Sequence, residues 1–192
     1  NLREYQEQMA QTHFYSLNIQ CQIVKSVVES VSKQNIILWS VTLESMPQYI
    51  FSFARKAILQ QLPTASSLHR WKKISSPACN LCNSGMTQTN KHVMNNCSNA
   101  KALERYSQRH DNVLSLLAGW ILSTKSTEQE LFVDLPSEKW NPIDQVFQPA
   151  CRPDILVIEH SKIFVLELTI CRETNLVNSK NYKINKYNAI QN

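Results

Sequence analysis

The chain has 192 residues, of which 43% are hydrophobic, and a formal net charge of +5 at pH 7. This length suits one medium domain or two small ones, large enough to bury a real core. Only two glycines occur, and the sequence has neither a glycine-rich phosphate loop nor a Rossmann fingerprint, which argues against the common nucleotide-binding classes. There is no run of about eighteen apolar residues, so we expect neither a transmembrane helix nor a membrane partner.

Residues 1–74 are predicted to form a helical linker region. Apolar residues repeat at spacings of three and four up to Asn35, which breaks the pattern: Ile23, Val24, Val27, Val28 and Val31. Pro47 can open a second helix that closes before Pro63. Its buried side is expected to hold Tyr49, Ile50, Phe53, Ala54, Ala57 and Ile58. Residues 62–71 are predicted to be a basic connector, and residues 36–39 are too few to assign.

The long stretch from Ser45 to Leu103 contains no aspartate or glutamate, so all its charged side chains are positive. Its cations are Arg55, Lys56, Arg70, Lys72, Lys73, Lys91 and Lys101. Such a stretch suggests a polyanionic neighbour, most simply the backbone of a nucleic acid. The alternative is a solvated basic face.

Residues 75–98 contain four candidate metal ligands in the order Cys79-x2-Cys82-x9-His92-x4-Cys97. Thiolates and an imidazole at these separations can supply a tetrahedral Zn²⁺ site from two short turns, and a zinc ion with four protein ligands is structural. Gly85 lies between the ligand pairs, where a tight turn is needed. The alternative is three free cysteines and a chance histidine. The ordered cluster favours metal binding and a reducing compartment over disulfides, and the other cysteines are predicted to be core residues: Cys21, Cys151 and Cys171.

A helix is predicted from Asn99 to Ser123. One stripe along it holds Leu103, Tyr106, His110, Val113, Leu114, Leu117 and Ile121. A histidine on such an apolar side is most often a satisfied core residue. A short strand follows at residues 131–135, ended by Pro136, and a proline-containing loop occupies residues 136–151.

Residues 152–169 are predicted to form a hairpin of two strands buried on both faces, because both arms are nearly continuous apolar runs. The only polar interruption centres the turn between His160 and Ser161. Counting outward places Asp154 directly across from Glu167, where like charges repel unless a divalent cation lies between them. The alternative is an exposed strand end with two solvated acids.

Thr174 or Asn175 can cap a last helix. Its apolar residues are Leu176, Val177, Ile184 and Ile190, while one face holds Lys180, Lys183 and Tyr187. That face can also be a solvated basic stripe. The order of helix, strand, hairpin and helix indicates an α/β fold with a small mixed sheet and flanking helices.

Four motifs follow one another in order along the chain. They are Arg55-x6-Leu62-Pro63-Thr64-x3-Leu68-x2-Trp71, the Cys-Cys-His-Cys cluster, Arg109-His110-Asp111-Asn112, and Arg152-Pro153-Asp154 with twelve residues to Glu167. Together they resemble the C-terminal region of non-LTR retrotransposon (LINE) polyproteins, in the group that carries a restriction-like endonuclease after the reverse transcriptase. The resemblance covers the chain from about Phe51 to its end.

The resemblance implies a CCHC zinc knuckle at residues 75–98 and a C-terminally truncated nuclease of the PD-(D/E)xK fold at residues 99–192. Such a nuclease nicks target DNA, so that the freed 3′ hydroxyl primes reverse transcription of the element's RNA. Asp154 and Glu167 would be the metal-binding acids. Thr169 stands where a restriction enzyme has its lysine, and a lysine on the following helix would replace it.

Lys183 is the first choice for that lysine, with Lys186 and Tyr187 nearby. The family's basic histidine motif matches at Arg109 and His110, with Asp111 where the family commonly has asparagine. The missing start methionine, the last helix cut at the chain end and the absent closing strand indicate an excerpt from a longer polypeptide.

The implied cofactors are structural Zn²⁺ and catalytic Mg²⁺. The implied partners are target DNA, element RNA and an upstream reverse transcriptase domain, in the nucleus, with no small-molecule ligand. Nucleic-acid contacts are expected from Arg55, Lys56, Arg70, Lys72, Lys73, Lys91 and Lys180. The competing hypothesis is a catalytically inactive, zinc-containing nucleic-acid-binding module from a decayed or domesticated element. A stand-alone resolvase or repair nuclease fits less well, because of the Leu-Pro-Thr and zinc motifs.

Overall fold

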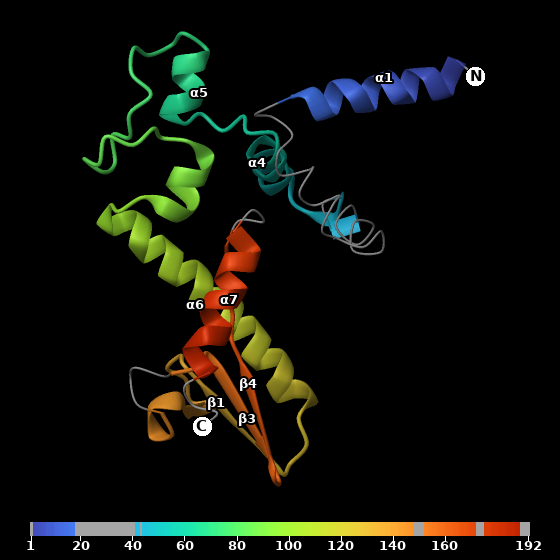
Figure 1. The fold of residues 1–192 in the computed structure, drawn as a ribbon. Coiled ribbons are helices and arrows are strands. Elements are labelled where there is room, and N and C mark those ends of the chain that lie inside the picture. The colour runs from blue at the N-terminus through green and yellow to red at the C-terminus, as the bar shows by residue number, and fades with distance from the viewer. Residues whose placement is uncertain (1, 18–40, 43, 148–151, 172–174, 189–192) are drawn as a thin grey trace. The chain divides into compact units, whose positions relative to one another are not determined.

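The computed structural model describes residues 2–17, 41, 42, 44–147, 152–171 and 175–188. The chain divides into two compact units, Asn1–Asn99 and Ala100–Asn192. The fold is mixed α/β: the first unit holds helices and the cysteine–histidine cluster, and the second holds a four-stranded sheet with helices around it (Figure 1). The predicted repeat before Asn35, the segment 36–39, Cys21, Cys151, Thr174 and Ile190 lie outside the described residues.

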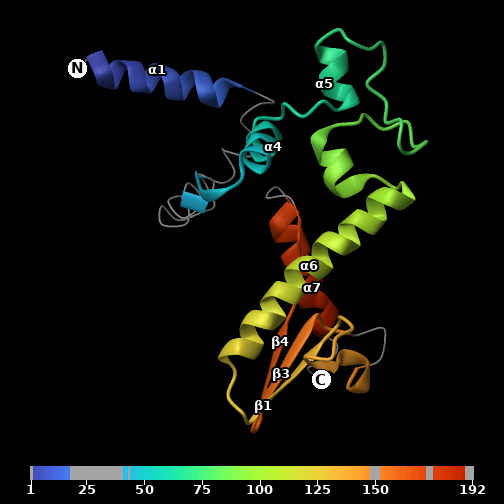
Figure 2. The ribbon, with the colours of Figure 1, turned by 180° about the vertical axis from the view of Figure 1, so that it is seen from behind.

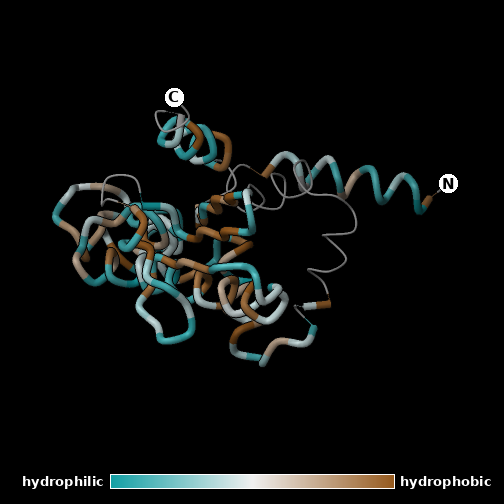
Figure 3. The backbone as a smooth tube through the Cα atoms, turned by 90° about the horizontal axis from the view of Figure 1, so that it is seen from below, coloured by the Kyte–Doolittle hydropathy of each residue, from teal (hydrophilic) through white to brown (hydrophobic). Residues whose placement is uncertain are grey.

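The first unit begins with α1 (Leu2–Ser16), a mostly hydrophilic helix whose described side chains are exposed (Figure 3). Further along the described residues, helix α4 (Gln48–Ile58) has Pro47 as its N-cap. Its predicted buried side is wrong, because none of its residues is buried, and Tyr49 and Phe53 are 76% and 53% exposed. The apolar stripe of α4 therefore lies on the surface of the described part of this unit.

A short helix, α5 (Ala65–Arg70), occupies the segment that was predicted to be a connector, so that prediction is wrong. Two side chains accept hydrogen bonds from its first turn. The Thr64 hydroxyl accepts from the Ser67 N–H at 3.4 Å, and the Gln88 side-chain oxygen accepts from the Ala65 N–H at 2.8 Å. A cap satisfies amide groups that the helix itself leaves unpaired. Because Gln88 lies far along the chain, the local pattern does not reveal this helix.

The sheet of the second unit consists of β1 (Gln129–Val133), β2 (Asn141–Pro142), β3 (Ile155–Glu159) and β4 (Lys162–Leu166). The strand order is β2-β1-β3-β4, with β1 and β2 parallel and the other pairs antiparallel. In the hairpin, Ile158 faces Ile163 and Ile155 faces Leu166, which confirms the predicted register. Asp154 and Glu167 are thus the next residues out, just beyond the strand ends.

The core lies on both faces of the sheet, as alternation along a strand requires. On one face, Leu131, Val133, Ile155 and Val157 pack against helix α6 (Ala100–Thr124), through Leu114 and Ala118 (Figure 2). On the other face, Phe132 and Leu156 pack with Ile143 of the short helix η2 (Ile143–Gln145). β1 and β3 are therefore central strands with two covered faces.

The prediction that both arms of the hairpin are buried holds for most of β3 and is wrong for β4. All five residues of β4 are exposed, and Ile163 is 65% exposed. The reason is position in the sheet, since β4 is an edge strand. Burial of a strand depends on its neighbours as well as on its own residues.

Helix α6 occupies almost the predicted span, but its buried face differs from the predicted stripe. Leu114 and Ala118 are fully buried, whereas Leu103 and Leu117 are exposed. The last helix, α7 (Leu176–Asn188), leaves its apolar residues exposed: Leu176, Val177 and Ile184. No helix within the described residues is long and apolar enough to cross a membrane.

Candidate functional site

Cys79 and Cys82 lie on a tight turn that the backbone closes. The Cys79 N–H donates to the Met86 carbonyl at 2.8 Å, and Ala78 and Thr87 form an isolated antiparallel bridge. Gly85 adopts φ +69°, a left-handed conformation that favours glycine. The tight turn predicted at Gly85 is present.

His92 is the first residue of a short π-helix, η1 (His92–Asn96), and Cys97 follows directly. Thr89 positions the start of this turn, because its hydroxyl accepts the His92 N–H at 3.1 Å. Bonds from residue i to i+5 bring side chains five residues apart toward one side, and such turns are frequent at functional sites. Here that spacing joins His92 to Cys97.

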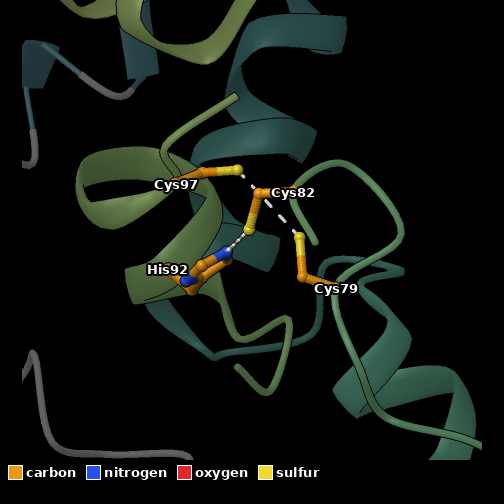
Figure 4. Close-up of side chains that lie close together, drawn as sticks. All are labelled: Cys79, Cys82, His92 and Cys97. Atoms are coloured by element: carbon orange, nitrogen blue, oxygen red, sulfur yellow. Dashed lines mark hydrogen bonds between the residues drawn. The ribbon is translucent and has the colours of Figure 1, made fainter. Parts of the chain in front are cut away.

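The four side chains form a compact, buried cluster (Figure 4). One ligand atom from each residue lies within 4.8 Å of the others. Cys82 Sγ is 3.2 Å from His92 Nε2, and Cys79 Sγ is 4.0 Å from Cys97 Sγ. Zinc–ligand bonds place tetrahedral ligands roughly 3.3–3.8 Å apart. The cluster therefore fits Zn²⁺ in donor type and in size, and none of its three cysteines is in a disulfide.

Two of these thiols are held toward the thiolate form. The hydroxyl of Ser84, 3.0 Å from Cys82 Sγ, is the main cause that lowers the pKa of Cys82 to about 5. Burial alone would raise the pKa of Cys79, but the N–H groups of Cys82 and Leu81 outweigh it and lower the pKa. Thiolates are the form that binds metal.

The pKa values of the other two ligands, Cys97 and His92, are raised. The N–H of Asn99 acts to lower the pKa of Cys97, but burial and the neighbouring thiols outweigh it and raise the pKa. Burial acts to lower the pKa of His92, but its hydrogen bond with Cys82 and the nearby thiols raise it overall. The cluster thus concentrates negative charge around one imidazole, an environment that favours a cation.

Gln88 connects the cluster to α5, a role that sequence reasoning missed. Its side-chain N–H₂ lies 3.6 Å from Cys79 Sγ and donates to Asn80 Oδ1 at 2.7 Å, while its oxygen accepts from the Ala65 N–H. Gln88 is only 8% exposed. Residues behind metal ligands orient them. A glutamine between the ligand pairs carries no spacing signal that would identify it.

A second cluster lies at the open end of the hairpin in the other unit. Asp154 is 9% exposed, and its Oδ2 accepts the Leu168 N–H at 2.6 Å. His110 of α6 lies on the other oxygen, with Nε2 3.4 Å from Asp154 Oδ1, and its Nδ1 lies 3.3 Å from Asp111 Oδ1. The Leu168 N–H and His110 thus hold the two oxygens of Asp154.

Three side chains of α7 converge on Glu167. Lys183 forms an ion pair with Glu167, and its Nζ lies 3.8 Å from Asp154 Oδ2. Lys186 lies 3.2 Å from Glu167 Oε1, and the Tyr187 hydroxyl donates to the same oxygen. Lys186 and Tyr187 also donate to the Arg152 carbonyl, at 2.9 and 3.2 Å.

Burial is the main cause that raises the pKa of Glu167, with the neighbouring Asp154 acting in the same direction. The contact with Lys183 acts to lower that pKa without cancelling the effect. The structure therefore places two carboxylates and a lysine from separate elements around one point.

The remaining predicted site residues lie in different surroundings. Arg109 lies over the Tyr106 ring, with Cζ 5.5 Å from its centroid. The predicted nucleic-acid-binding cations are exposed: Arg55, Lys56, Arg70, Lys72, Lys73, Lys91 and Lys180. Sequence reasoning gave Arg152 no role of its own, yet its side chain pairs with Asp134 and its carbonyl anchors α7.

Residues 15–103 match the family model described as zinc-binding in reverse transcriptase. The matched range includes Cys79, Cys82, His92 and Cys97. This part of the chain is therefore similar to the zinc-binding domains associated with reverse transcriptases, and its Cys/Cys/His/Cys cluster agrees with that part of the resemblance. No curated protein and no solved structure matches the chain.

Proposed function

We propose that the chain is a Mg²⁺-dependent DNA endonuclease of the PD-(D/E)xK type joined to a zinc-containing nucleic-acid-binding domain. It would nick target DNA to prime reverse transcription of a non-LTR retrotransposon. The observation that carries the proposal is the convergence of Asp154, Glu167 and Lys183 at one end of the hairpin. These are the residue types, and the order along the chain, that phosphodiester hydrolysis by this class of nuclease needs.

The paired acids provide hard oxygen ligands, the donors that Mg²⁺ prefers beside water and phosphate. Asp154 and Glu167 would hold the ion. When bound, Mg²⁺ would polarise the scissile phosphate and lower the pKa of an attacking water. The ammonium group of Lys183, in contact with one acid and 3.8 Å from the other, already shows that this point favours positive charge.

Lys183 would act on the water and the phosphate rather than on the metal. Its Nζ is placed to orient the attacking water or to neutralise charge that develops on the phosphate, a form of electrostatic stabilisation. Lys186 and Tyr187 hold Glu167 and the Arg152 carbonyl together, which fixes α7 against the start of β3. His110 holds Asp154 from the opposite side.

Replacing the acids tests the proposal. The Asp154→Asn and Glu167→Gln proteins should lose Mg²⁺-dependent nicking of supercoiled plasmid by at least about 100-fold, while retaining DNA binding. The exposed Asp144 gives a matched control, because Asp144→Asn removes the same charge from another part of the unit. Nicking by the Asp154→Asn protein at the rate of the Asp144→Asn protein would falsify the assignment.

The zinc-binding unit would hold nucleic acid beside an upstream reverse transcriptase in the nucleus. The cations of residues 45–103 can contact phosphates and so fix the position of a nucleic-acid backbone, although such contacts do not read the base sequence. Target DNA and element RNA are both candidates for this contact.

A second candidate function is a nucleic-acid-binding module without catalysis. The observation that favours it is the crowding of Glu167 by Lys183, Lys186 and Tyr187, which neutralises the acids without any metal. The plasmid assay separates the two candidates. Nicking that requires Mg²⁺ and stops with EDTA favours the nuclease, and binding without nicking favours the module.

A further inference from the structure

We propose that the turn following α5 binds single-stranded nucleic acid, with phosphate contacts from Arg70, Lys72 and Lys73 and base stacking on Trp71. This inference rests on the proposed function for the class of partner and assigns the site and the strandedness. Four observations support it: a basic groove, a strained lysine, an exposed tryptophan and a rigid base.

The groove has a volume of about 660 Å³ and is lined by His69, Arg70, Lys72, Lys73, Ile74 and Ser75. Sites of this size accommodate ligands on the scale of a nucleotide. Three of its six lining residues are cations, and the whole stretch from Ser45 to Leu103 carries no acid to oppose them. Its charge therefore suits a polyanion and disfavours a basic peptide.

Lys72 occupies a backbone conformation that glycine usually takes. α5 ends in a Schellman arrangement, in which the Lys73 N–H donates to the Leu68 carbonyl and the Lys72 N–H to the His69 carbonyl, both at 2.9 Å. The residue at the left-handed position is Lys72, with φ +57°. A lysine there is strained relative to glycine. The attraction of cations for a helix C-terminus accounts for the positive charges at the end of α5, but it does not account for a lysine in place of glycine at the left-handed position.

Trp71 lies between Arg70 and Lys72 in the sequence and is 41% exposed. An exposed indole flanked by cations along the chain suits single strands, because unpaired bases stack on aromatic rings without regard to sequence. Bases inside a duplex already stack on one another and do not offer their faces. The tryptophan therefore selects single strands over duplexes.

The base of the site is rigid. Thr64 and the buried Gln88 cap the first turn of α5, and Gln88 also contacts Cys79 of the zinc cluster. Arg70 is held from the other side, since its Nη2 donates to the Gln60 carbonyl at 3.4 Å. Pre-organised cations lose less conformational entropy when they bind.

The test measures binding of a fluorescent single-stranded RNA, the single-stranded DNA of the same sequence and its duplex to the zinc-loaded 192-residue chain. Lys72→Gly relieves the strain and removes the charge. We expect this protein to unfold at a higher temperature and still to bind single strands more weakly, with the slope of log affinity against log salt reduced by about 0.7. His160→Gly is the control for relief of backbone strain, because His160 has φ +51° in the hairpin turn of the other unit.

The tryptophan is tested in the same assay. Trp71→Ala should weaken single-strand binding about tenfold and leave duplex binding nearly unchanged, and Trp71→Phe should restore most of the loss. Unchanged single-strand binding by Lys72→Gly, or equal losses for single strand and duplex with Trp71→Ala, overturns the proposal. The RNA and DNA arms identify which strand is preferred. Asp154→Asn should bind single strands normally, so loss of the nuclease assignment and loss of this site give different results.

Discussion

At the scale of single residues, Lys183 is the side chain that lies near both acids, since it pairs with Glu167 and its Nζ is 3.8 Å from Asp154 Oδ2. Lys183→Ala should reduce nicking by about 100-fold or more. Lys139→Ala, an exposed lysine elsewhere in the same unit, should leave the rate within about twofold, since exposed charges contribute little locally. Rates are compared on supercoiled plasmid at saturating Mg²⁺. Equal losses for the two lysines would show that Lys183 supplies only general positive charge.

The zinc ligands make a prediction about protons. Because Ser84 lowers the pKa of Cys82 to about 5, Cys82 is already a thiolate at pH 7, whereas the ordinary pKa of 9.0 would keep it protonated. The raised pKa of Cys97 means that this thiol must lose a proton when zinc binds. Zinc affinity should therefore fall as the pH falls.

The number of protons released when zinc binds tests whether Ser84 keeps Cys82 in the thiolate form. Ser84→Ala should raise the pKa of Cys82 toward its ordinary value, so zinc binding at pH 7 should release up to about one more proton than in the unchanged protein. Ser75→Ala, an exposed serine of the same unit, is the control. Calorimetry in two buffers with different ionisation enthalpies gives the count. Identical counts for all three proteins would contradict the assigned role of Ser84.

At the scale of elements, the two glycines make a matched pair. A Cβ added at either Gly85 or Gly119 meets nothing within 4 Å, so only the backbone conformation differs. Gly85→Ala should destabilise the zinc-binding unit by about 1 kcal/mol, because φ +69° disfavours a side chain. Gly119→Ala, inside α6, should stabilise its unit by about 0.5–1 kcal/mol. Thermal unfolding with zinc present measures the change in stability of both proteins. A change of the same sign in both would show that backbone conformation does not decide the effect.

How much of these elements the sequence could predict depends on how local their causes are. The zinc ligands and the pairing of Asp154 with Glu167 follow from spacing and from one polar break, so they could be counted along the chain. The exposure of β4 could not, because it depends on strand order. Helix α5 could not either, because Gln88, 23 residues beyond Ala65, supplies part of its cap.

The buried face of α6 shows the same limit in another form. Its apolar residues are abundant enough to suggest several stripes, and the sheet selects the one that contains Leu114 and Ala118. Leu103 and Leu117 belong to the predicted stripe yet stay exposed. Amphipathic pattern identifies a helix well, but the neighbouring element decides which face it covers.

At the scale of the whole molecule, the division into two units predicts that zinc stabilises only the unit that contains the cysteine–histidine cluster. Chelation of zinc should speed hydrogen exchange at the amides that the cluster organises, such as those of Cys79 and Gln88. The amides of β1 and β3 should keep their protection, because they belong to the other unit. Exchange measured by mass spectrometry with and without a chelator tests this. Loss of protection throughout the sheet would show that the two units unfold together.

The edge strand β4 has a consequence for the behaviour of the chain in solution. Lys162–Leu166 is an apolar edge strand whose five residues are all exposed, with a single charged residue at its start. Natural sheets guard such edges with charges, prolines or bulges, since an unguarded one is a template for cross-β growth. We therefore expect concentrated preparations to form thioflavin-positive aggregates, and a lysine in place of Val165 to slow their formation.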